Sequence, residues 1–142
     1  MNKPKSIGFT LIELMVVVSI VAMLSAIAYP SFNSYMFRSR RADAQNLLTR
    51  VAAEQERHYS QFNRYALDLS AAPPAGLGMT LLTSEHGYYT VSVAAGPSGD
   101  NQTYALTATA GGRQASDECG NMSLNSAGVK TYSGSSTNRA CW

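Results

Sequence analysis

Residues 8–29 read GFTLIELMVVVSIVAMLSAIAY, and this stretch decides the fold of the chain. From Phe9 to Tyr29 it is 21 residues long, contains neither glycine nor proline, and carries one charged side chain, Glu13. As a helix it would be roughly 31 Å long, which is enough to cross the hydrocarbon core of a membrane. Lys3 and Lys5 precede it, and this basic start predicts that the N-terminus stays on the cytoplasmic side.

Three interpretations fit such a segment. It could be a secretory signal cut after Ala26-Ile27-Ala28, a plain single-pass anchor, or a segment whose short leader is cut between Gly8 and Phe9. A carboxylate inside a membrane segment costs roughly 2.5–3.5 kcal/mol at the helix centre, and less near its end. Because a signal or an inert anchor gains nothing from that cost, Glu13 favours a segment whose carboxylate finds a positive partner.

The run Gly8-Phe9-Thr10-Leu11-Ile12-Glu13-Leu14 resembles the leader of type IV pilins and their pseudopilin relatives. The resemblance implies that a prepilin peptidase cuts after Gly8 and methylates the new amine of Phe9. The family's glutamate five residues into the mature chain matches Glu13. We expect Glu13 to direct assembly, because its carboxylate lacks a cation on its own helix and the freed amine of Phe9 is the obvious partner. The chain departs from the family at Ala22, where many major pilins have a helix-loosening glycine.

Helical spacing resumes beyond Pro30. The apolar positions follow the i, i+3, i+4, i+7, i+8 pattern of one helix face, and they are Ala44, Leu47, Leu48, Val51 and Ala52. We therefore expect one long helix after a leader at residues 1–8. Residues 9–30 would form its transmembrane or filament-core half, and residues 31–59 its amphipathic half. Arg38, Arg40 and Arg41 are expected to form a solvated collar.

The remaining chain predicts a sheet. Residues 60–87 have no regular pattern and are expected to connect helix and sheet, with five side chains turned inward: Tyr65, Leu67, Leu69, Leu81 and Leu82. Within residues 88–142, segments 88–94 and 103–110 alternate, and segments 122–124 and 129–132 flank a hairpin turn. Four short strands with tight connections predict an antiparallel sheet packed on the amphipathic helix, an α+β class. This is also the type IV pilin fold that the resemblance implies.

Cys119 and Cys141 bracket the last two predicted strands. If the head lies outside the inner membrane, its compartment is oxidising and the two cysteines are expected to form a disulfide. Closing a loop of that size should add about 3 kcal/mol to stability. A cysteine-bounded C-terminal region is also what pilins have.

The composition disfavours several classes of function. Without Lys3 and Lys5, nine Lys and Arg balance nine Asp and Glu, so bulk charge does not favour nucleic-acid binding. His58 and His86 lack partners at metal-ligand spacing and are read as ordinary side chains. Asp100, Asp117 and Glu118 do not form a recognisable calcium loop. The chain has no phosphate-binding or hydrolase motif, so we expect neither an enzyme nor a cofactor or metal.

The predicted head resembles PilE-type minor pilins of Gram-negative bacteria, including ComP, which binds DNA. The matching motifs are Gln61-Phe62-Asn63-Arg64-Tyr65, Gly87-Tyr88-Tyr89-Thr90-Val91, Tyr104-Ala105-Leu106-Thr107-Ala108 and the run from Cys119 to Lys130. The resemblance implies a structural minor pilin that helps to initiate the type IV pilus or enters it, for adhesion and twitching motility. Its partners would be the prepilin peptidase, the inner-membrane assembly platform, the major pilin and other minor pilins.

Three alternative functions stay open. A DNA receptor would need a cationic stripe, for which the candidates are Arg57, Arg64, Arg113, Lys130 and Arg139. The other two alternative functions are those of a type II secretion pseudopilin and of a major pilin. In the favoured interpretation the subunit crosses the inner membrane once, with a periplasmic head, and then enters the pilus on the cell surface.

Overall fold

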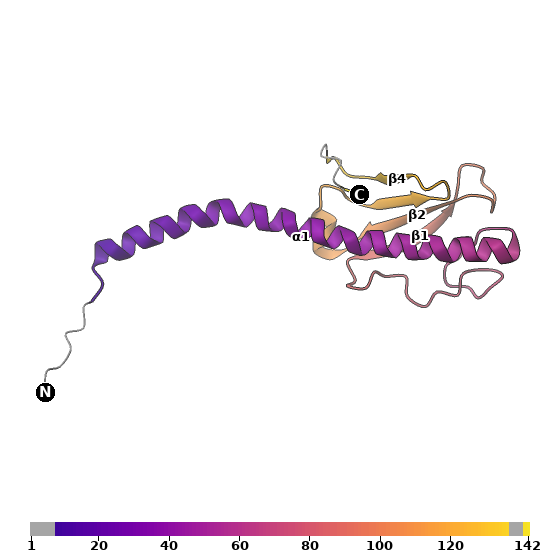
Figure 1. Cartoon of the computed structure of the whole chain (residues 1–142), viewed down its shortest axis with the longest axis horizontal. Helices are drawn as coiled ribbons and strands as arrows, with labels where there is room; N and C mark the ends of the chain where they lie inside the picture. Colours follow the sequence, from indigo (N-terminus) through magenta and orange to yellow (C-terminus); the bar gives the residue numbers. More distant parts are fainter. Residues whose placement is uncertain (1–7, 137–140) are drawn as a thin grey trace, which may run out of the picture. The chain divides into compact units, whose positions relative to one another are not determined.

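One long helix and a four-stranded sheet make up the structure, a computed structural model that describes residues 8–136 and 141–142. Lys3, Lys5 and Arg139 lie outside the described residues. Helix α1 spans Leu11–Phe62, 52 residues. The chain divides into two compact units, Met1–Met36 and Phe37–Trp142, which are described in turn below. Figure 1 colours both along the sequence.

In the N-terminal unit, α1 is apolar on every side. Large side chains from Phe9 to Tyr35 are exposed around the whole helix, with exposed fractions from 51% at Val16 to 81% at Phe9. No described residue of this unit is buried. The helix is long and apolar enough to cross a membrane, by length and composition. This half of α1 therefore has apolar surface that its own unit leaves uncovered.

In the second unit, called the head here, α1 contributes one face to the core. Ala44, Leu48 and Val51 are fully buried, as the helical spacing predicts. The helix continues beyond the expected end at residue 59 and stops at Phe62. Asn63 then adopts a left-handed conformation, with φ at 54°, and its amide still donates to the carbonyl of Tyr59. Asparagine tolerates this conformation and commonly ends helices in this way.

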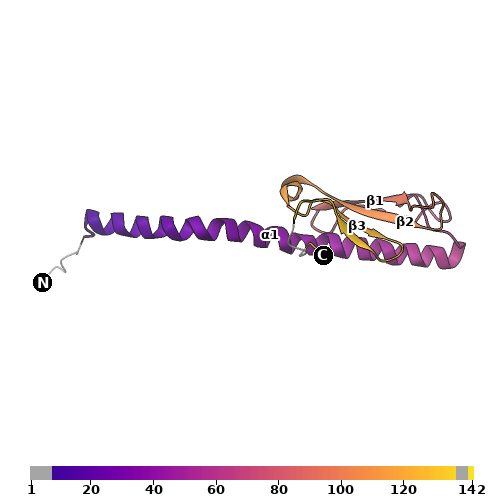
Figure 2. The same cartoon turned by 90° about the horizontal axis from the view of Figure 1, so that it is seen from above.

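The sheet has the order β1-β2-β3-β4, and every neighbouring pair is antiparallel. The strands are β1 at Tyr89–Ala95, β2 at Tyr104–Ala110, β3 at Met122–Asn125 and β4 at Lys130–Tyr132, and a short 3-10 helix, η1, spans Gly112–Ser116. Figures 1 and 2 show the strands alongside the second half of α1, with the sheet on one side of the helix. The expected α+β fold is confirmed.

The core lies between α1 and the inward face of the sheet. Alternate strand residues point into it, as the period-2 pattern predicts, and they are Tyr89, Val91, Tyr104, Leu106, Ala108, Met122 and Leu124. The outward residues between them stay half-buried or exposed. One face of the sheet is thus available to solvent.

The connecting segment is only partly turned inward. Tyr65 and Leu69 are buried in the core and Leu82 packs against it. Leu67 and Leu81 are exposed, at 37% and 66%, so the expectation for these two was wrong. Individual contacts, rather than a repeating pattern of apolar residues, hold this segment in place. One of them is the buried Gln55 amide, which pairs with both backbone groups of Ala66 at 2.7 and 2.9 Å.

Tyr104 makes the head sensitive to alkali. Burial raises the pKa of Tyr104 to about 12, and nearby Glu56 and Tyr65 add to the rise. A tyrosine in an unfolded chain has a pKa of about 10. The folded head therefore keeps a proton that the unfolded chain loses between these values, and stability falls as the pH rises through that window.

We expect the urea concentration at the midpoint of unfolding, measured on the full chain in detergent micelles, to drop between pH 8 and pH 11. The drop should be smaller for Tyr104→Phe, which removes the ionisable group and keeps the ring. The head's far-ultraviolet circular dichroism reports the unfolding. Equal drops in the two proteins would show that Tyr104 does not contribute.

Candidate functional site

The start of α1 places Glu13 in a helix cap. The Thr10 hydroxyl accepts a hydrogen bond from the Glu13 amide at 3.3 Å. In return, the Thr10 amide and hydroxyl donate to Glu13 Oε2, at 3.4 and 3.2 Å. This reciprocal Thr-x-x-Glu arrangement is a capping box, which satisfies amides that the first helical turn leaves unpaired. Thr10 three residues before Glu13 was the sequence signal, and it was missed.

The cap lies among exposed apolar side chains. Gly8 and Phe9 precede the helix, and Phe9 is 81% exposed. Farther along, the Ser19 hydroxyl donates to the carbonyl of Met15 at 2.8 Å, so its own helix satisfies it. Glu13 is the one charge between Phe9 and Tyr29. The carboxylate is thus held at the helix N-terminus, where the helix dipole favours negative charge.

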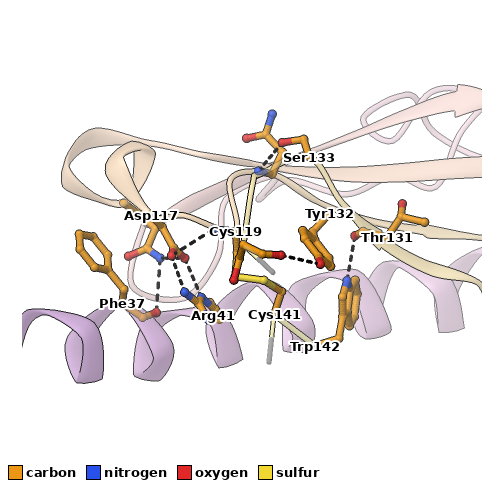
Figure 3. Close-up of a disulfide and its surroundings, with 12 residues drawn as sticks. Phe37, Arg41, Asp117, Cys119, Thr131, Tyr132, Ser133, Cys141 and Trp142 are labelled. Carbon is orange, nitrogen blue, oxygen red and sulfur yellow. Dashed lines mark hydrogen bonds and ion pairs between the residues drawn. A yellow bond between two sulfur atoms is a disulfide. The ribbon is translucent and has the colours of Figure 1, made fainter. Parts of the chain in front are cut away.

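In the head, a disulfide joins Cys119 to Cys141, with their Cα atoms 5.6 Å apart and both side chains fully buried (Figure 3). Ser136 and Trp142, which follow β4 in the sequence, both contact this strand. The Tyr132 hydroxyl donates to the carbonyl of Ser136, and the Trp142 indole donates to the carbonyl of Thr131, at 2.9 and 2.8 Å. The disulfide therefore fixes the C-terminal end beside the shortest strand of the sheet.

An ion pair ties this region to α1. The Arg41 guanidinium donates from Nε and Nη2 to the two carboxylate oxygens of Asp117, at 2.7 and 2.5 Å (Figure 3). The side chains are 13% and 1% exposed. The Gln114 amide and the Cys119 backbone amide also donate to Asp117, at 3.0 and 3.3 Å. The hydrogen bond to Asp117 is the main cause of a raised pKa at Arg41.

The expected solvated collar is therefore wrong for two of its three arginines. Arg41 is paired with Asp117, and the Arg40 guanidinium lies 4.6 Å from the centre of the Tyr88 ring. Arg38 is exposed as expected. The partners of Arg40 and Arg41 are far away in the sequence, so the local pattern could not identify them.

The remaining acidic and imidazole groups have ordinary partners. Asp100 accepts hydrogen bonds from the Ser98 hydroxyl and the Gln102 amide, and the first of these is the main cause of its lowered pKa. Buried His58 lies 2.9 Å from the Arg64 carbonyl, and exposed His86 lies 3.3 Å from Asp43. Within residues 8–136 and 141–142, no group of three or more His, Cys, Asp or Glu could hold a metal ion.

Comparison with known proteins identifies the family. Residues 30–123 match the family model described as type IV minor pilin ComP, DNA uptake sequence receptor. Residues 3–29 match the prokaryotic N-terminal methylation motif. The chain is a type IV pilin with a ComP-like domain. The resemblance of the leader and the head to this family is confirmed.

Curated relatives and a solved structure agree with that assignment. This pilin is 38% identical over 96 residues to the type IV major pilin protein PilA of Myxococcus xanthus, 66% of this chain and 40% of that protein. It is 35% identical to the fimbrial protein EcpC of Eikenella corrodens, over 70% of this chain and 61% of that one. A type IV pilin structure from Shewanella oneidensis aligns with a TM-score of 0.53 and 32% identity, over 75% of this chain and 97% of that one. The chain spans less than two thirds of either curated relative.

Three of the cations weighed for a DNA stripe have partners within this pilin. Arg57 pairs with Glu54, and Arg64 donates to the carbonyl of Pro74 at 3.2 Å. Arg113 belongs to η1, and Lys130 lies 5.1 Å from the centre of the Trp142 ring. Figures 1 and 2 place the segment after β2 and the C-terminal end of α1 at opposite ends of the head. Arg113 is therefore far from Arg57 and Arg64.

The Arg41–Asp117 pair predicts a measurable coupling energy. Arg41→Met leaves a buried carboxylate without its cation, which should destabilise the head by about 3 kcal/mol. The double variant Arg41→Met/Asp117→Leu should cost clearly less than the sum of the two single changes. Urea unfolding of the three variants measures this. Arg38→Met, one turn earlier and exposed, is the matched control and should change stability by less than about 0.5 kcal/mol. If the free-energy cost of the double variant equalled the sum of the costs of the two single variants, the pairing would be contradicted.

Proposed function

We propose that this pilin is a minor subunit of the type IV pilus that helps to initiate the filament or is incorporated into it. The carrying observation is Glu13, the one carboxylate held at the start of a helix whose large side chains up to Tyr29 are hydrophobic and exposed. Such a helix suits two environments in turn, the bilayer before assembly and a bundle of equivalent helices afterwards. The proposed partners are the inner-membrane assembly platform, the major pilin and other minor pilins.

Processing comes first in this proposal. A prepilin peptidase removes residues 1–8 by cutting between Gly8 and Phe9 and methylates the new amine of Phe9. The match of residues 3–29 to the methylation motif supports this step. Before assembly the subunit spans the inner membrane once, with the head in the periplasm. The oxidising periplasm is also consistent with the Cys119–Cys141 disulfide.

Glu13 then places the subunit in the filament. The freed amine of Phe9, on the same chain or on a staggered neighbour, is the cation nearest in sequence to its carboxylate. In a low dielectric, a charge without its partner is strongly unfavourable, so pairing selects one axial offset between subunits. Until then, Thr10 stabilises the carboxylate through the capping box at 3.2–3.4 Å.

A bulky residue before the cut should block processing. We expect Gly8→Trp to leave an uncut precursor in the inner membrane, whereas the wild-type protein begins at Phe9. N-terminal sequencing and intact-mass measurement of the purified protein distinguish the two, and the mass also reports methylation. A mature protein that begins at Tyr29 or Pro30 would instead support a secretory signal.

Loss of the Glu13 charge should reduce incorporation without affecting the helix start. Glutamine also serves in a capping box, so Glu13→Gln keeps the cap and removes the charge. We expect cleavage and head folding to be unchanged, and the amount in sheared pili to fall about tenfold, since a tenfold change needs only about 1.4 kcal/mol. Quantitative immunoblotting of sheared pili against whole cells measures this. Wild-type incorporation of Glu13→Gln would rule out charge pairing.

Thr10→Val is the matched variant, because it removes the hydroxyl bonds and leaves the charge. It should enter pili far better than Glu13→Gln, and an equal loss would assign the effect to helix capping.

The same wild-type preparation gives the copy number of this subunit relative to the other pilins. A copy number equal to or above theirs would make it a major pilin.

A second candidate function is DNA binding by the head. The match of residues 30–123 to a model described as a DNA uptake sequence receptor favours it. The pairing of Arg57 and Arg64 within the head weighs against strong electrostatic binding. A gel-shift titration with the full chain would decide, since salt-sensitive binding is what a DNA receptor requires.

A further inference from the structure

Two carboxylates are buried among the described residues of the head, and they differ in their partners. The side chain of Asp117 is 1% exposed and is bound by the Arg41 guanidinium. The side chain of Asp43, on α1, is 8% exposed and contacts His86 alone. The His86 amide lies 3.4 Å from Oδ2 of Asp43, and its ring Nδ1 lies 3.3 Å from Oδ1. Both distances exceed those of ordinary hydrogen bonds, about 2.7–3.2 Å.

Asp43 therefore lacks the cation that a buried carboxylate normally has. Within residues 8–136 and 141–142, neither lysine nor arginine forms an ion pair with it. His86 carries a charge only when it is protonated, and its side chain is 65% exposed, so water surrounds most of it. The position of Asp43 is thus suited to a cation that the described part of the chain does not supply.

Asp43 lines a hollow between α1 and the turn that precedes β1. The hollow has a volume of about 220 Å³, and its other lining residues are Asn46, Leu47, Arg50, Ser84 and Glu85. Ser84 is 4% exposed, and its oxygen accepts a hydrogen bond from the Tyr89 amide at 3.1 Å. A hydroxyl oxygen has a second lone pair for another donor. These six residues, the Asp43 hollow, therefore bring oxygen-bearing side chains from α1 and from the turn to one place.

The lining has an acidic and a basic end. Asp43 and Glu85 are its carboxylates, and Arg50 is its one cation, so the lining carries a net charge of −1. Neither Glu85 nor Arg50 forms an ion pair with another described residue. Arg50 follows Asp43 by two helical turns, which places it about 10.5 Å farther along the axis. The charge thus favours a cation near Asp43 and disfavours a second cation near Arg50.

These properties select one kind of ligand. An ammonium group has three N–H donors and no acceptor, which suits a site whose acidic end consists of oxygen acceptors. The buried side chain of Leu47 offers apolar surface for an aliphatic stem. Pockets for small molecules usually measure roughly 300–1,000 Å³, so a smaller hollow suits a single side chain. A free diamine would bring its second ammonium group towards Arg50.

We propose that the Asp43 hollow receives a lysine side chain of another protein chain. The ammonium group binds the carboxylates of Asp43 and Glu85 and the hydroxyl oxygen of Ser84, and the methylene stem packs against Leu47. The bound ammonium group supplies the cation that Asp43 lacks. The proposal concerns the head alone and does not depend on how the subunit is placed in a filament.

Ligand-observed NMR tests the site with Nα-acetyl-lysine methylamide as the probe. The full chain in lipid nanodiscs is titrated into the probe, and broadening of the ε-methylene signal is measured. The nanodiscs contain zwitterionic lipid, because an anionic surface would attract the probe by itself. Empty nanodiscs give the background. We expect saturable broadening, and none above background for the same probe acetylated at Nε, which keeps the stem and loses the charge.

Variants of the lining separate the two ends of the hollow. Asp43→Asn keeps the shape of the side chain and removes its charge, so it should weaken binding about tenfold. Arg50→Gln removes the lining's one cation from an exposed position and should strengthen binding about threefold. This gain of affinity cannot result from misfolding. Glu118→Gln is the matched control, because Glu118 is exposed and lies outside the hollow, and it should bind like wild type. Circular dichroism confirms that each variant is folded.

Four results would overturn the proposal. The first is no binding of the lysine probe above that of empty nanodiscs. The second is equal binding of the Nε-acetylated probe, because the stem alone would then be recognised. The third is unchanged binding by both Asp43→Asn and Arg50→Gln. The fourth is tighter binding of 1,4-diaminobutane than of the lysine probe, which would assign the hollow to a free polyamine. Incorporation into pili is a separate measurement, so failure here leaves the proposed pilus function untouched.

Discussion

The structure depends on one constraint: the apolar surface of the first half of α1 has no cover within its own unit. From Phe9 to Tyr35 its large side chains are exposed on all sides, and water is a poor environment for such a surface. The cover must come from lipid or from other helices. The head must therefore complete its own core without help from residues 9–36, and it does so with the second half of α1, a four-stranded sheet and the buried side chains between them.

A sheet this small needs attachment at its far edge. β4 has three residues and ends the sheet, so few backbone hydrogen bonds hold it. The disulfide returns the C-terminal end to the turn before β3, and the Trp142 indole binds the carbonyl of Thr131, the middle residue of β4. Asp117, two residues before Cys119, is bound by Arg41 of α1. The helix, the turn before β3 and the C-terminal tail are thus connected through one short stretch of chain.

Patterns that repeat could be predicted from the sequence, and single contacts could not. The helix face around Leu48 and the alternation in β1 and β2 repeat over several residues, so they predicted the elements and their inward sides. Leu67 and Leu81 are apolar in a segment without a pattern, and their exposure could not be deduced. Arg41 meets Asp117 across 76 positions in the sequence, so only the folded chain brings them together. The Thr10–Glu13 cap is different, because its signal, a threonine three residues before a glutamate, is local in the sequence.

The outward face of the sheet illustrates the same limit. Each strand's alternation identifies Ser92, Thr107, Ser123 and Thr131 as outward residues one strand at a time, but their alignment into a row depends on register. Register is fixed by the inward side chains, because a slip of one residue would place hydroxyls in the core. The inward packing of Val91, Leu106 and Met122 therefore determines where the outward hydroxyls lie. Substitutions on the outward face leave that packing intact, so the outward surface of the sheet can change while the head keeps its fold.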